Sequence, residues 1–306
     1  MAEDEKTAVR DIRSLFGEQS SPEKREVPYF IVIAGGTVGM MYKLTQQDTY
    51  IGRATDAEIR VDDEGVSRKH ARVSTTPNQQ VIIIDLGSTN GTYVNGQKVA
   101  EQVLRDGDKV QIGSTTVLKF SYQDALEESF QRKLFDSAVK DGLTGIYNKK
   151  YFVDRLETDF PHAKRHRANL TLMIFDIDHF KKINDTHGHP AGDHCLRELA
   201  GLIKKTLRNE DVFARFGGEE FVILTRDVDD TGALVLAERI RRLVEGNKFV
   251  FEGKTIPVTI SVGISTMTAT SNPPFTDAAD MVNRADQYLY KAKRSGRNRV
   301  EGKAVE

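Results

Sequence analysis

The sequence predicts a two-domain chain, in which an all-β sandwich is followed by a helical segment and a mixed α/β domain. Its 306 residues suffice for two domains of ordinary size, each with its own core. Short alternating or apolar runs separated by Gly, Asn, Asp and Pro fill residues 27–120, which is typical of a β-sandwich. After residue 141, strand-like and helix-like segments alternate, which is typical of an α/β domain.

Composition narrows the possible partners. The 44 Lys and Arg residues are balanced by 45 Asp and Glu residues, so no charge excess indicates nucleic acid or an acidic membrane surface. The charged start "MAEDEKTAVRDIR" lacks the apolar run of a signal peptide, and the longest apolar stretch, "YFIVIAGGTVGMMY", is too short for a membrane helix. We therefore expect a cytoplasmic protein with no nucleic-acid or membrane partner. The single cysteine, Cys195, is expected in a helix core.

The chain is expected to begin with a mobile polar tail over residues 1–26. A helical linker is predicted over residues 121–140, between the sandwich and the α/β domain. Its apolar stripe consists of Leu126, Phe130, Leu134 and Ala138. Such a stripe either packs on its own domain or pairs with the same helix of a second subunit.

The α/β domain, residues 141–306, is expected to contain these elements in order. "LTLMIFDID" is a nearly continuous apolar run, as in a strand buried on both faces. The segments that follow are a helix in "GHPAGDHCLRELAGLIKKTL", a hairpin in "VFARFGGEEFVILTR", a helix in "ALVLAERIRRLV", a strand in "PVTISVGIST" and a last helix in "AADMVNRADQYLYKAKRSG".

The hairpin places paired glutamates beside a tight bend. Gly217 and Gly218 are expected at the centre of the turn, where positive φ costs glycine little. This bend places Glu219 and Glu220 at the tip of the sheet. Alone, the pattern is no more than a turn with a charged edge.

A second carboxylate pair gives the hairpin chemical meaning. Asp176 and Asp178, in "FDIDHF", lie two residues apart at the end of the buried strand and so share one face. Carboxylates gathered there repel one another unless a cation collects them. Hard oxygen donors suit Mg²⁺ or Mn²⁺, and phosphoryl transfer with two metals is the corresponding chemistry.

From Asp141 to the C-terminus the chain resembles a diguanylate cyclase of the GGDEF family. The motifs that carry this resemblance are "DGLTGIYNKKY", "FDIDHFKKINDTHGH", "AGD", "RFGGEEF" and "YKAKRSGRN", in the family's order and spacing. The resemblance implies a nucleotidyl-cyclase-like fold with a ferredoxin-like palm. It also implies an enzyme that condenses two GTP molecules into cyclic di-GMP and releases pyrophosphate.

The same resemblance implies a role for individual residues. Metal ions, two Mg²⁺ or Mn²⁺ for each GTP, would be held by Asp176, the Ile177 carbonyl and Glu219. Glu220 would orient the metal shell, help to deprotonate the attacking hydroxyl, or only face water.

Nucleotide contacts are implied in the same way. The guanine edge would contact Asn184 and Asp193, with Leu143 beside the base. The triphosphate would contact Lys181, Lys293, Arg297 and the backbone amides near His179 and Phe180. Because each domain holds one GTP, catalysis would require a homodimer with two catalytic domains face to face.

The segment "RNED" lies five residues before Gly217 and matches the family's RxxD inhibitory site. Arg208 and Asp211 would read a guanine edge of the product cyclic di-GMP, with Arg239 as a second arginine. Taken alone, such a pair is usually a local salt bridge or a set of surface charges. The resemblance predicts product feedback.

Residues 27–120 resemble a forkhead-associated (FHA) domain, a module that binds phosphothreonine peptides, through "YIGRATDAEI", "GVSRKHARV" and "LGSTNGTYVNG". Arg53, Ser67 and Arg68 could surround a phosphate, while Thr89 and Asn90 hold the peptide backbone. His70 is expected to brace these loops. The alternative is a purely structural spacer.

The tail holds a candidate phosphosite, Thr7, in "EDEKTAVRDIR", which a Ser/Thr kinase could reach. The alternative is an unmodified threonine in a disordered leader. The leading hypothesis is a cyclase controlled by phosphothreonine recognition. The competing ones are a sensor that binds GTP or cyclic di-GMP without turnover, and an adaptor that only recruits phosphorylated partners.

Overall fold

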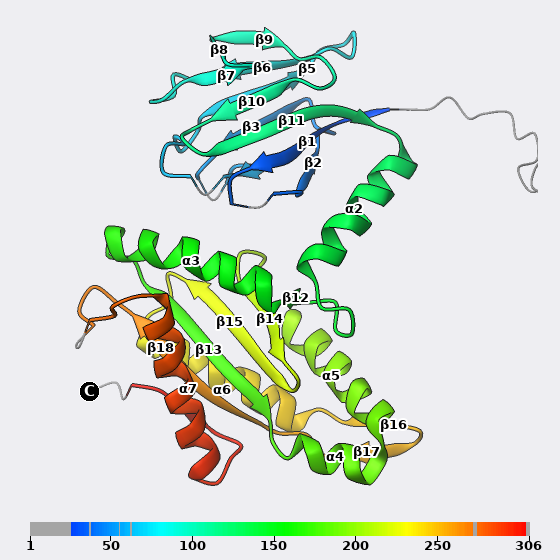
Figure 1. Cartoon of the computed structure of the whole chain (residues 1–306), viewed down its shortest axis with the longest axis vertical. Coiled ribbons are helices and arrows are strands. Elements are labelled where there is room, and N and C mark those ends of the chain that lie inside the picture. The colour runs from blue at the N-terminus through cyan, green and yellow to red at the C-terminus, as the bar shows by residue number, and fades with distance from the viewer. Residues whose placement is uncertain (1–25, 37, 55, 62, 272–273, 304–306) are drawn as a thin grey trace, which may run out of the picture. The chain divides into compact units, whose positions relative to one another are not determined.

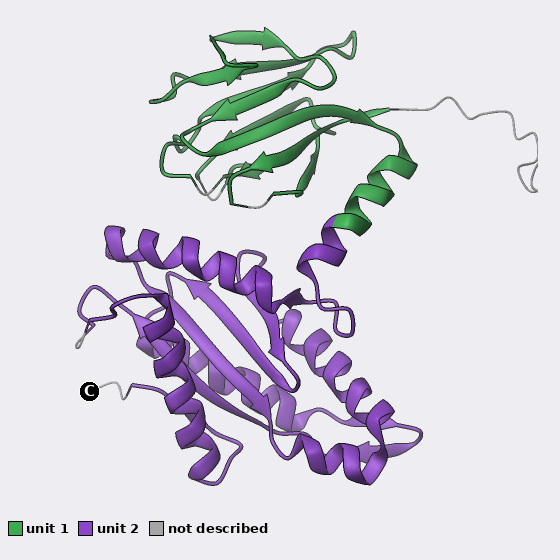
Figure 2. Cartoon of the chain, viewed as in Figure 1, with its two compact units in different colours: residues 1–134 green, residues 135–306 purple. Residues whose placement is uncertain are grey.

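The computed structural model describes residues 26–303 except 37, 55, 62 and 272–273. The chain forms two compact units, residues 1–134 and 135–306 (Figure 2). The candidate phosphosite Thr7 lies outside the described residues. Within the described part of the chain, no helix is both long enough and apolar enough to cross a membrane.

Unit 1 is a sandwich of two mainly antiparallel sheets (Figure 1). One sheet has the order β2 (Met41–Lys43), β1 (Val27–Ala34), β11 (Thr116–Gln123), β10 (Lys109–Ile112), β7 (Thr92–Val94) and β8 (Gln97–Val99). The other has the order β4 (Ile59–Arg60), β3 (Asp48–Gly52), β5 (Ala71–Thr75), β6 (Val81–Asp85) and β9 (Glu101–Val103). The predicted sandwich is confirmed.

Alternation along the strands builds the core of unit 1. In β1 and β11, Phe30 and Phe120 are opposite each other, and both are fully buried with their rings edge to face at 5.8 Å. Ile51 and Ile83 reach the same core from the second sheet. Burial of these side chains is the main stabilising contribution of the sandwich.

Helix α2 (Ala125–Val139) begins four residues later than the predicted linker because β11 continues to Gln123. A capping box sets its start: the Asp124 carboxylate accepts from the amides of Leu126 and Glu127, and the Glu127 carboxylate accepts from the Asp124 amide. No residue of α2 is buried. Of the predicted stripe, Leu126 is 78%, Phe130 60% and Leu134 49% exposed.

Unit 2 is an α/β domain around one mixed sheet. Its strands follow the order β12 (Tyr147–Asn148), β14 (Val212–Gly217), β15 (Glu220–Arg226), β13 (Leu170–Ile177), β18 (Ile260–Met267) and β19 (Val300–Glu301). A separate hairpin joins β16 (Phe249–Phe251) and β17 (Lys254–Ile256). All eight residues of β13 are buried, as its continuous apolar run predicted.

Helices cover both faces of this sheet (Figure 1). One face carries α3 (Lys149–His166) and α7 (Ala278–Arg294). The other carries α4 (Phe180–His187), α5 (His189–Lys204) and α6 (Asp230–Gly246). The expected helices correspond to α5, α6 and α7, and Cys195 is buried in α5 as predicted.

Helix α3 was not among the elements expected from the sequence. It contains Pro161, a residue that normally interrupts helices, although Asn148 caps its first turn by accepting from the Tyr151 amide. Its apolar face, Phe152, Leu156, Phe160 and Ala163, is spaced by four, four and three residues. That spacing is a helical signal that could have identified it.

Candidate active site, product pocket and phosphopeptide surface

The candidate active site lies where β13 and the β14–β15 hairpin end. Asp176 pairs across the sheet with Glu220, and Glu219 lies in the adjoining turn. The turn differs from the prediction: Gly217 is the last residue of β14 and pairs with Glu220, so Gly218 and Glu219 are central. Only Gly218 needs positive φ, at 53°.

Asp176 is a buried carboxylate, 7% exposed, whose Oδ2 accepts from Lys293 Nζ at 2.9 Å. Burial raises the pKa of Asp176 to about 6; Lys293 opposes this shift, while Glu219 and Glu220 add to it. Three carboxylates, those of Asp176, Glu219 and Glu220, lie near one another here, and only one lysine, Lys293, acts against them. One lysine does not balance three negative charges. A divalent cation would, because it adds positive charge beside the same oxygens.

The donor set fits such a cation. Asp176 and Glu219 supply carboxylate oxygens, and Ile177 follows Asp176 at the end of β13. All are hard oxygen donors of the kind that Mg²⁺ and Mn²⁺ prefer. Glu220, half-buried beside them, adds a further carboxylate.

Asp178 does not belong to this donor set, although it shares the FDID motif. Its carboxylate accepts from the hydroxyls of Thr259 at 2.8 Å and Ser261 at 2.7 Å, and from the Asn298 amide at 3.0 Å. The expectation that a cation gathers both Asp176 and Asp178 is therefore wrong for Asp178. Its negative charge is stabilised by three protein donors instead.

The predicted guanine contacts lie on two adjoining helices. Within the described part of the chain, Oδ1 of Asn184, on α4, is buried and has no hydrogen-bond partner. Gly192 of α5 packs so closely that a Cβ there would collide with this oxygen. Asp193 follows Gly192, and Leu143 packs partly buried against the same core. A buried acceptor of this kind fits a ligand that donates N–H groups.

The predicted triphosphate contacts come from α7, the turn after it, and the start of α4. Lys293 contacts Asp176, while Arg297 follows α7 with its backbone amide donating to the Ala292 carbonyl. Lys181 is exposed on the first turn of α4. That helix begins at Phe180 without a side-chain cap, although the Lys182 amide already donates to the His179 carbonyl at 2.8 Å. An anion at this helix start would therefore be bound by the amides that precede Lys182.

The three predicted inhibitory-site residues line one hollow of about 380 Å³. The Arg208 amide donates to the Asp211 carboxylate at 2.9 Å, and the Arg239 guanidinium donates to the Thr206 carbonyl at 3.1 Å. Burial raises the pKa of Asp211, and the hydrogen bond from Arg208 opposes this shift. Arg208 and Asp211 also border a second hollow, of about 340 Å³, which Lys140 and Lys204 line.

In unit 1 the predicted phosphate contacts meet at adjoining loops. The amide of Arg53 donates to the Ser67 carbonyl, and that of Ala54 to the Arg68 carbonyl, both at 3.1 Å. The Ser67 hydroxyl accepts from the Thr89 amide at 3.1 Å. Arg53, Ser67, Arg68 and Thr89 are thus brought together as the sequence predicted.

The remaining predicted loop residues hold this arrangement in place. His70 is fully buried; its Nδ1 accepts from the Ser67 amide, and its Nε2 lies 3.2 Å from the Gly91 carbonyl. Asn90 donates to the Gly65 carbonyl at 2.8 Å. The bracing role expected of His70 agrees with these contacts.

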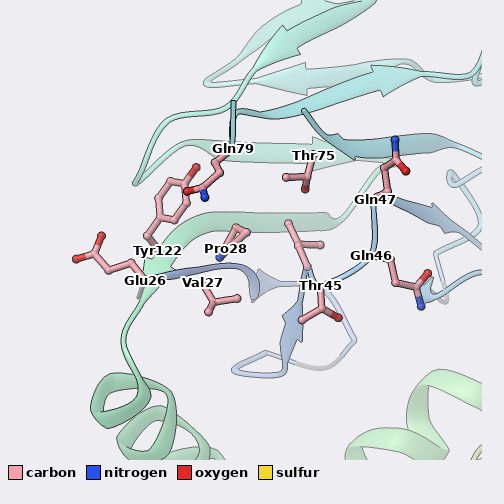
Figure 3. Close-up of a pocket in the computed structure, with 10 residues that line it drawn as sticks. Glu26, Val27, Pro28, Thr45, Gln46, Gln47, Thr75, Gln79 and Tyr122 are labelled. Atoms are coloured by element: carbon pink, nitrogen blue, oxygen red, sulfur yellow. The ribbon is translucent and has the colours of Figure 1, made fainter. Parts of the chain in front are cut away.

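Unit 1 also has a broad hollow of about 1270 Å³ at the opposite end of the same strands (Figure 3). It is lined by Gln47, just before β3, and by Thr75, which ends β5, whereas Arg53 follows the far end of β3. Among the residues that the structure describes, its lining includes Glu26 but no Lys or Arg. The described lining therefore offers no cation for a phosphate.

Comparison with known proteins agrees with both halves of this description. A family model described as "Diguanylate cyclase, GGDEF domain" matches residues 138–299, more than half of the chain, and an FHA-domain model matches residues 49–113. The chain therefore belongs to the GGDEF family and combines that domain with an FHA domain. Both predicted families are confirmed.

Two curated relatives illustrate the similarity. Diguanylate cyclase A of Treponema denticola is 40% identical over 172 residues, which cover 55% of this chain and 45% of that protein. Response regulator PleD of Caulobacter vibrioides is 32% identical over 289 residues, covering 94% of this chain and 60% of that protein. The chain thus spans about half the length of these relatives.

Solved structures show the same fold in unit 2. The coiled coil and GGDEF domain of DgcB from Caulobacter crescentus, in complex with c-di-GMP, aligns with a TM-score of 0.52 at 29% identity. That alignment covers 57% of this chain and 91% of the solved DgcB chain. Diguanylate cyclase SiaD of Pseudomonas aeruginosa, solved in complex with its activator SiaC, aligns with a TM-score of 0.52 at 32% identity. The alignment covers 58% of this chain and 66% of the solved SiaD chain.

Proposed function

We propose that the protein is a diguanylate cyclase that condenses two GTP molecules into cyclic di-GMP and releases two pyrophosphates. The proposal rests on one observation. Buried Asp176 lies near Glu219 and contacts Lys293, and this group of charges needs a further cation to balance its carboxylates. The orphaned acceptor of Asn184 supports a guanine base, because guanine presents N–H donors on the edge where adenine presents an acceptor. The curated relatives named diguanylate cyclases agree with this proposal.

Asp176, Glu219 and the Ile177 carbonyl would hold Mg²⁺ or Mn²⁺, two ions for each GTP, which supply charge stabilisation at the α-phosphate. Lys181, Lys293 and Arg297 bind the triphosphate and orient its pyrophosphate as the leaving group. Asn184 and Asp193 fix the guanine, with Leu143 beside it.

The remaining steps follow from the stoichiometry. The ribose 3′ oxygen of one GTP attacks the α-phosphorus of the other in line, and each attack forms one P–O bond while pyrophosphate departs. Glu220 orients the site or accepts the 3′ proton. Because one domain holds one GTP, two copies of unit 2 must meet, and the exposed apolar stripe of α2 supports a homodimer.

Regulation is proposed at two places. The hollow lined by Arg208, Asp211 and Arg239 would bind cyclic di-GMP and give product feedback. In unit 1, Arg53, Ser67 and Arg68 would bind the phosphate of a phosphothreonine, with Thr89 and Asn90 on the peptide backbone. A Ser/Thr kinase would supply that partner, and Thr7 of the same chain is the candidate phosphosite.

The active-site assignment is tested by Glu219→Ala and Asp176→Ala in the full chain. Both are expected to abolish formation of cyclic di-GMP from GTP and Mg²⁺, by at least about a thousandfold, because each removes a metal ligand. Glu157→Ala, which removes an exposed charge from α3 elsewhere in unit 2, is the matched control and should keep wild-type turnover. Wild-type rates in either site variant, with an unchanged far-ultraviolet spectrum, would refute the assignment. A protein that binds GTP without turnover would instead be a sensor.

A further inference from the structure

The turn after α7 has an unusual backbone. Arg297 and Asn298 are consecutive residues with positive φ, 61° and 44°. Residues other than glycine rarely adopt this conformation, and it persists only where surrounding contacts hold it. The contacts that hold this turn therefore indicate which of its residues needs a fixed position.

Asn298 is bound on two sides. Its backbone amide donates to Oδ2 of Asp178 at 3.0 Å. Its side chain accepts from Nη1 of Arg241 at 2.7 Å and donates to Oε1 of Glu245 at 2.6 Å. The turn is thereby joined both to the end of β13 and to α6.

Both anchors are themselves fixed. Asp178 is 5% exposed, and its carboxylate accepts hydrogen bonds from the hydroxyls of Thr259 and Ser261. Its backbone amide donates to the Thr259 carbonyl at 2.9 Å. On α6, Arg241 also pairs with Glu238 at 3.1 Å and with Glu245 at 2.9 Å. Neither anchor can move far without breaking several charge-assisted hydrogen bonds.

The residue that this framework holds is Arg297. Its side chain is exposed, and no ion pair to its guanidinium is seen among the residues that the structure describes. It lies one position before Asn298 and four after Lys293, which contacts Asp176. Arg297 is thus a free cation on a tightly held backbone at the edge of the carboxylate site.

We propose that Asp178 and Asn298 are positioning residues, which hold Arg297 in place for the triphosphate of GTP. This inference rests on the proposed function. Asp178 and Asn298 act only through the backbone of the turn. A turn without these contacts would sample other conformations, so part of the binding free energy would be spent on ordering it.

The test is a double-mutant cycle on the full chain. Asn298→Gly removes both side-chain bonds to α6 and suits the positive φ, so it releases the turn without adding strain. Isothermal calorimetry measures binding of Mg²⁺ with a GTP analogue whose α,β-bridging oxygen is a methylene group. We expect Asn298→Gly to weaken binding on the order of fivefold and Arg297→Ala on the order of tenfold. The double variant should bind no more weakly than Arg297→Ala.

The controls separate this inference from the proposed function. Arg294→Ala removes an exposed arginine from the same helix end and should bind like wild type, and far-ultraviolet melting checks the fold of every variant. Losses that multiply in the double variant, or wild-type binding by Asn298→Gly, would overturn the positioning role of the Asn298 side chain while leaving the cyclase assignment intact. Wild-type binding by Arg297→Ala would remove Arg297 from the nucleotide site and this proposal with it. Failure of the wild-type chain to bind the analogue would count against the proposed function itself.

Discussion

Two buried aspartates show how neighbouring groups decide the behaviour of a carboxylate. Burial alone would raise the pKa of Asp63, but hydrogen bonds from Thr115, Gly65 and Ser114 outweigh it and lower the pKa to about 2. Burial raises the pKa of Asp176 to about 6, and a single lysine does not reverse the shift. The charge of Asp63 is therefore stabilised within unit 1, whereas Asp176 is the carboxylate that we propose as a metal ligand.

Asp176→Asn should stabilise metal-free unit 2 at neutral pH. The folded-state pKa of Asp176, about 6, lies above the ordinary value of 3.8, so the folded protein binds this proton more tightly than the unfolded chain. The contribution of Asp176 to stability is therefore fully present below pH 3.8 and is lost as pH rises through 6. The neutral side chain of the variant avoids a penalty of up to about 3 kcal/mol. Urea unfolding followed by circular dichroism, in a chelator at pH 7.5 and pH 4, measures the difference.

The matched control is Asp178→Asn, which should lower stability because the carboxylate it replaces has three donors. A wild-type protein at least as stable as Asp176→Asn at pH 7.5 would show that burial of Asp176 carries no penalty. The FDID motif alone could not distinguish these two aspartates. The partners of Asp178 come from Thr259, Ser261 and Asn298, far along the chain, and only the fold brings them together.

At the scale of elements, the sequence predicted what depends on local spacing. An apolar run predicted the buried strand β13, and paired glycines predicted the hairpin. Apolar periodicity predicted the helices α5, α6 and α7. The turn centre was misplaced by one residue because register is set by pairing across the sheet: Gly217 pairs with Glu220. Helix α3 was not predicted, because it contains Pro161. The proline destabilises the helix, and burial of the helix's apolar face offsets that loss of stability.

The hollow of about 380 Å³ that Arg208, Asp211 and Arg239 line leads to a prediction about product feedback. Arg208→Ala should raise the concentration of cyclic di-GMP needed for half inhibition by roughly tenfold, since a charged hydrogen-bond donor to the ligand is lost. Initial rates with added product measure this. Arg242→Ala, an exposed arginine of α6 that does not line the pocket, should behave like wild type. An unchanged inhibition curve for Arg208→Ala would exclude the pocket as the feedback site.

Helix α2 leads to a prediction about assembly. Leu126→Glu combined with Phe130→Glu should convert dimers to monomers, because both side chains are exposed and apolar in the single chain. Light scattering after size exclusion measures the mass, and turnover should fall roughly tenfold as the effective concentration of catalytic domains drops. Lys133→Ala, on the same helix, is the control. A variant that remains dimeric would show that the subunits associate elsewhere.

At the scale of the whole molecule, the chain joins a candidate phosphothreonine reader to a candidate cyclase. A peptide of residues 1–13 phosphorylated on Thr7 should bind the full chain at least about tenfold more tightly than the plain peptide, since the phosphate adds charge-assisted hydrogen bonds. Calorimetry with wild type, Arg53→Ala and the control Lys69→Ala tests this. Equal binding of both peptides, or undiminished binding to Arg53→Ala, would mean that the ligand comes from another protein.

The most direct test of the proposed function is whether this chain makes cyclic di-GMP. Purified full chain is incubated with GTP and Mg²⁺, and the products are separated by chromatography, identified by mass and counted against released pyrophosphate. We expect cyclic di-GMP and pyrophosphate in a one-to-two ratio, with neither formed from ATP. If a natively folded protein, checked by circular dichroism, binds GTP but leaves it unchanged, the chain is not a diguanylate cyclase.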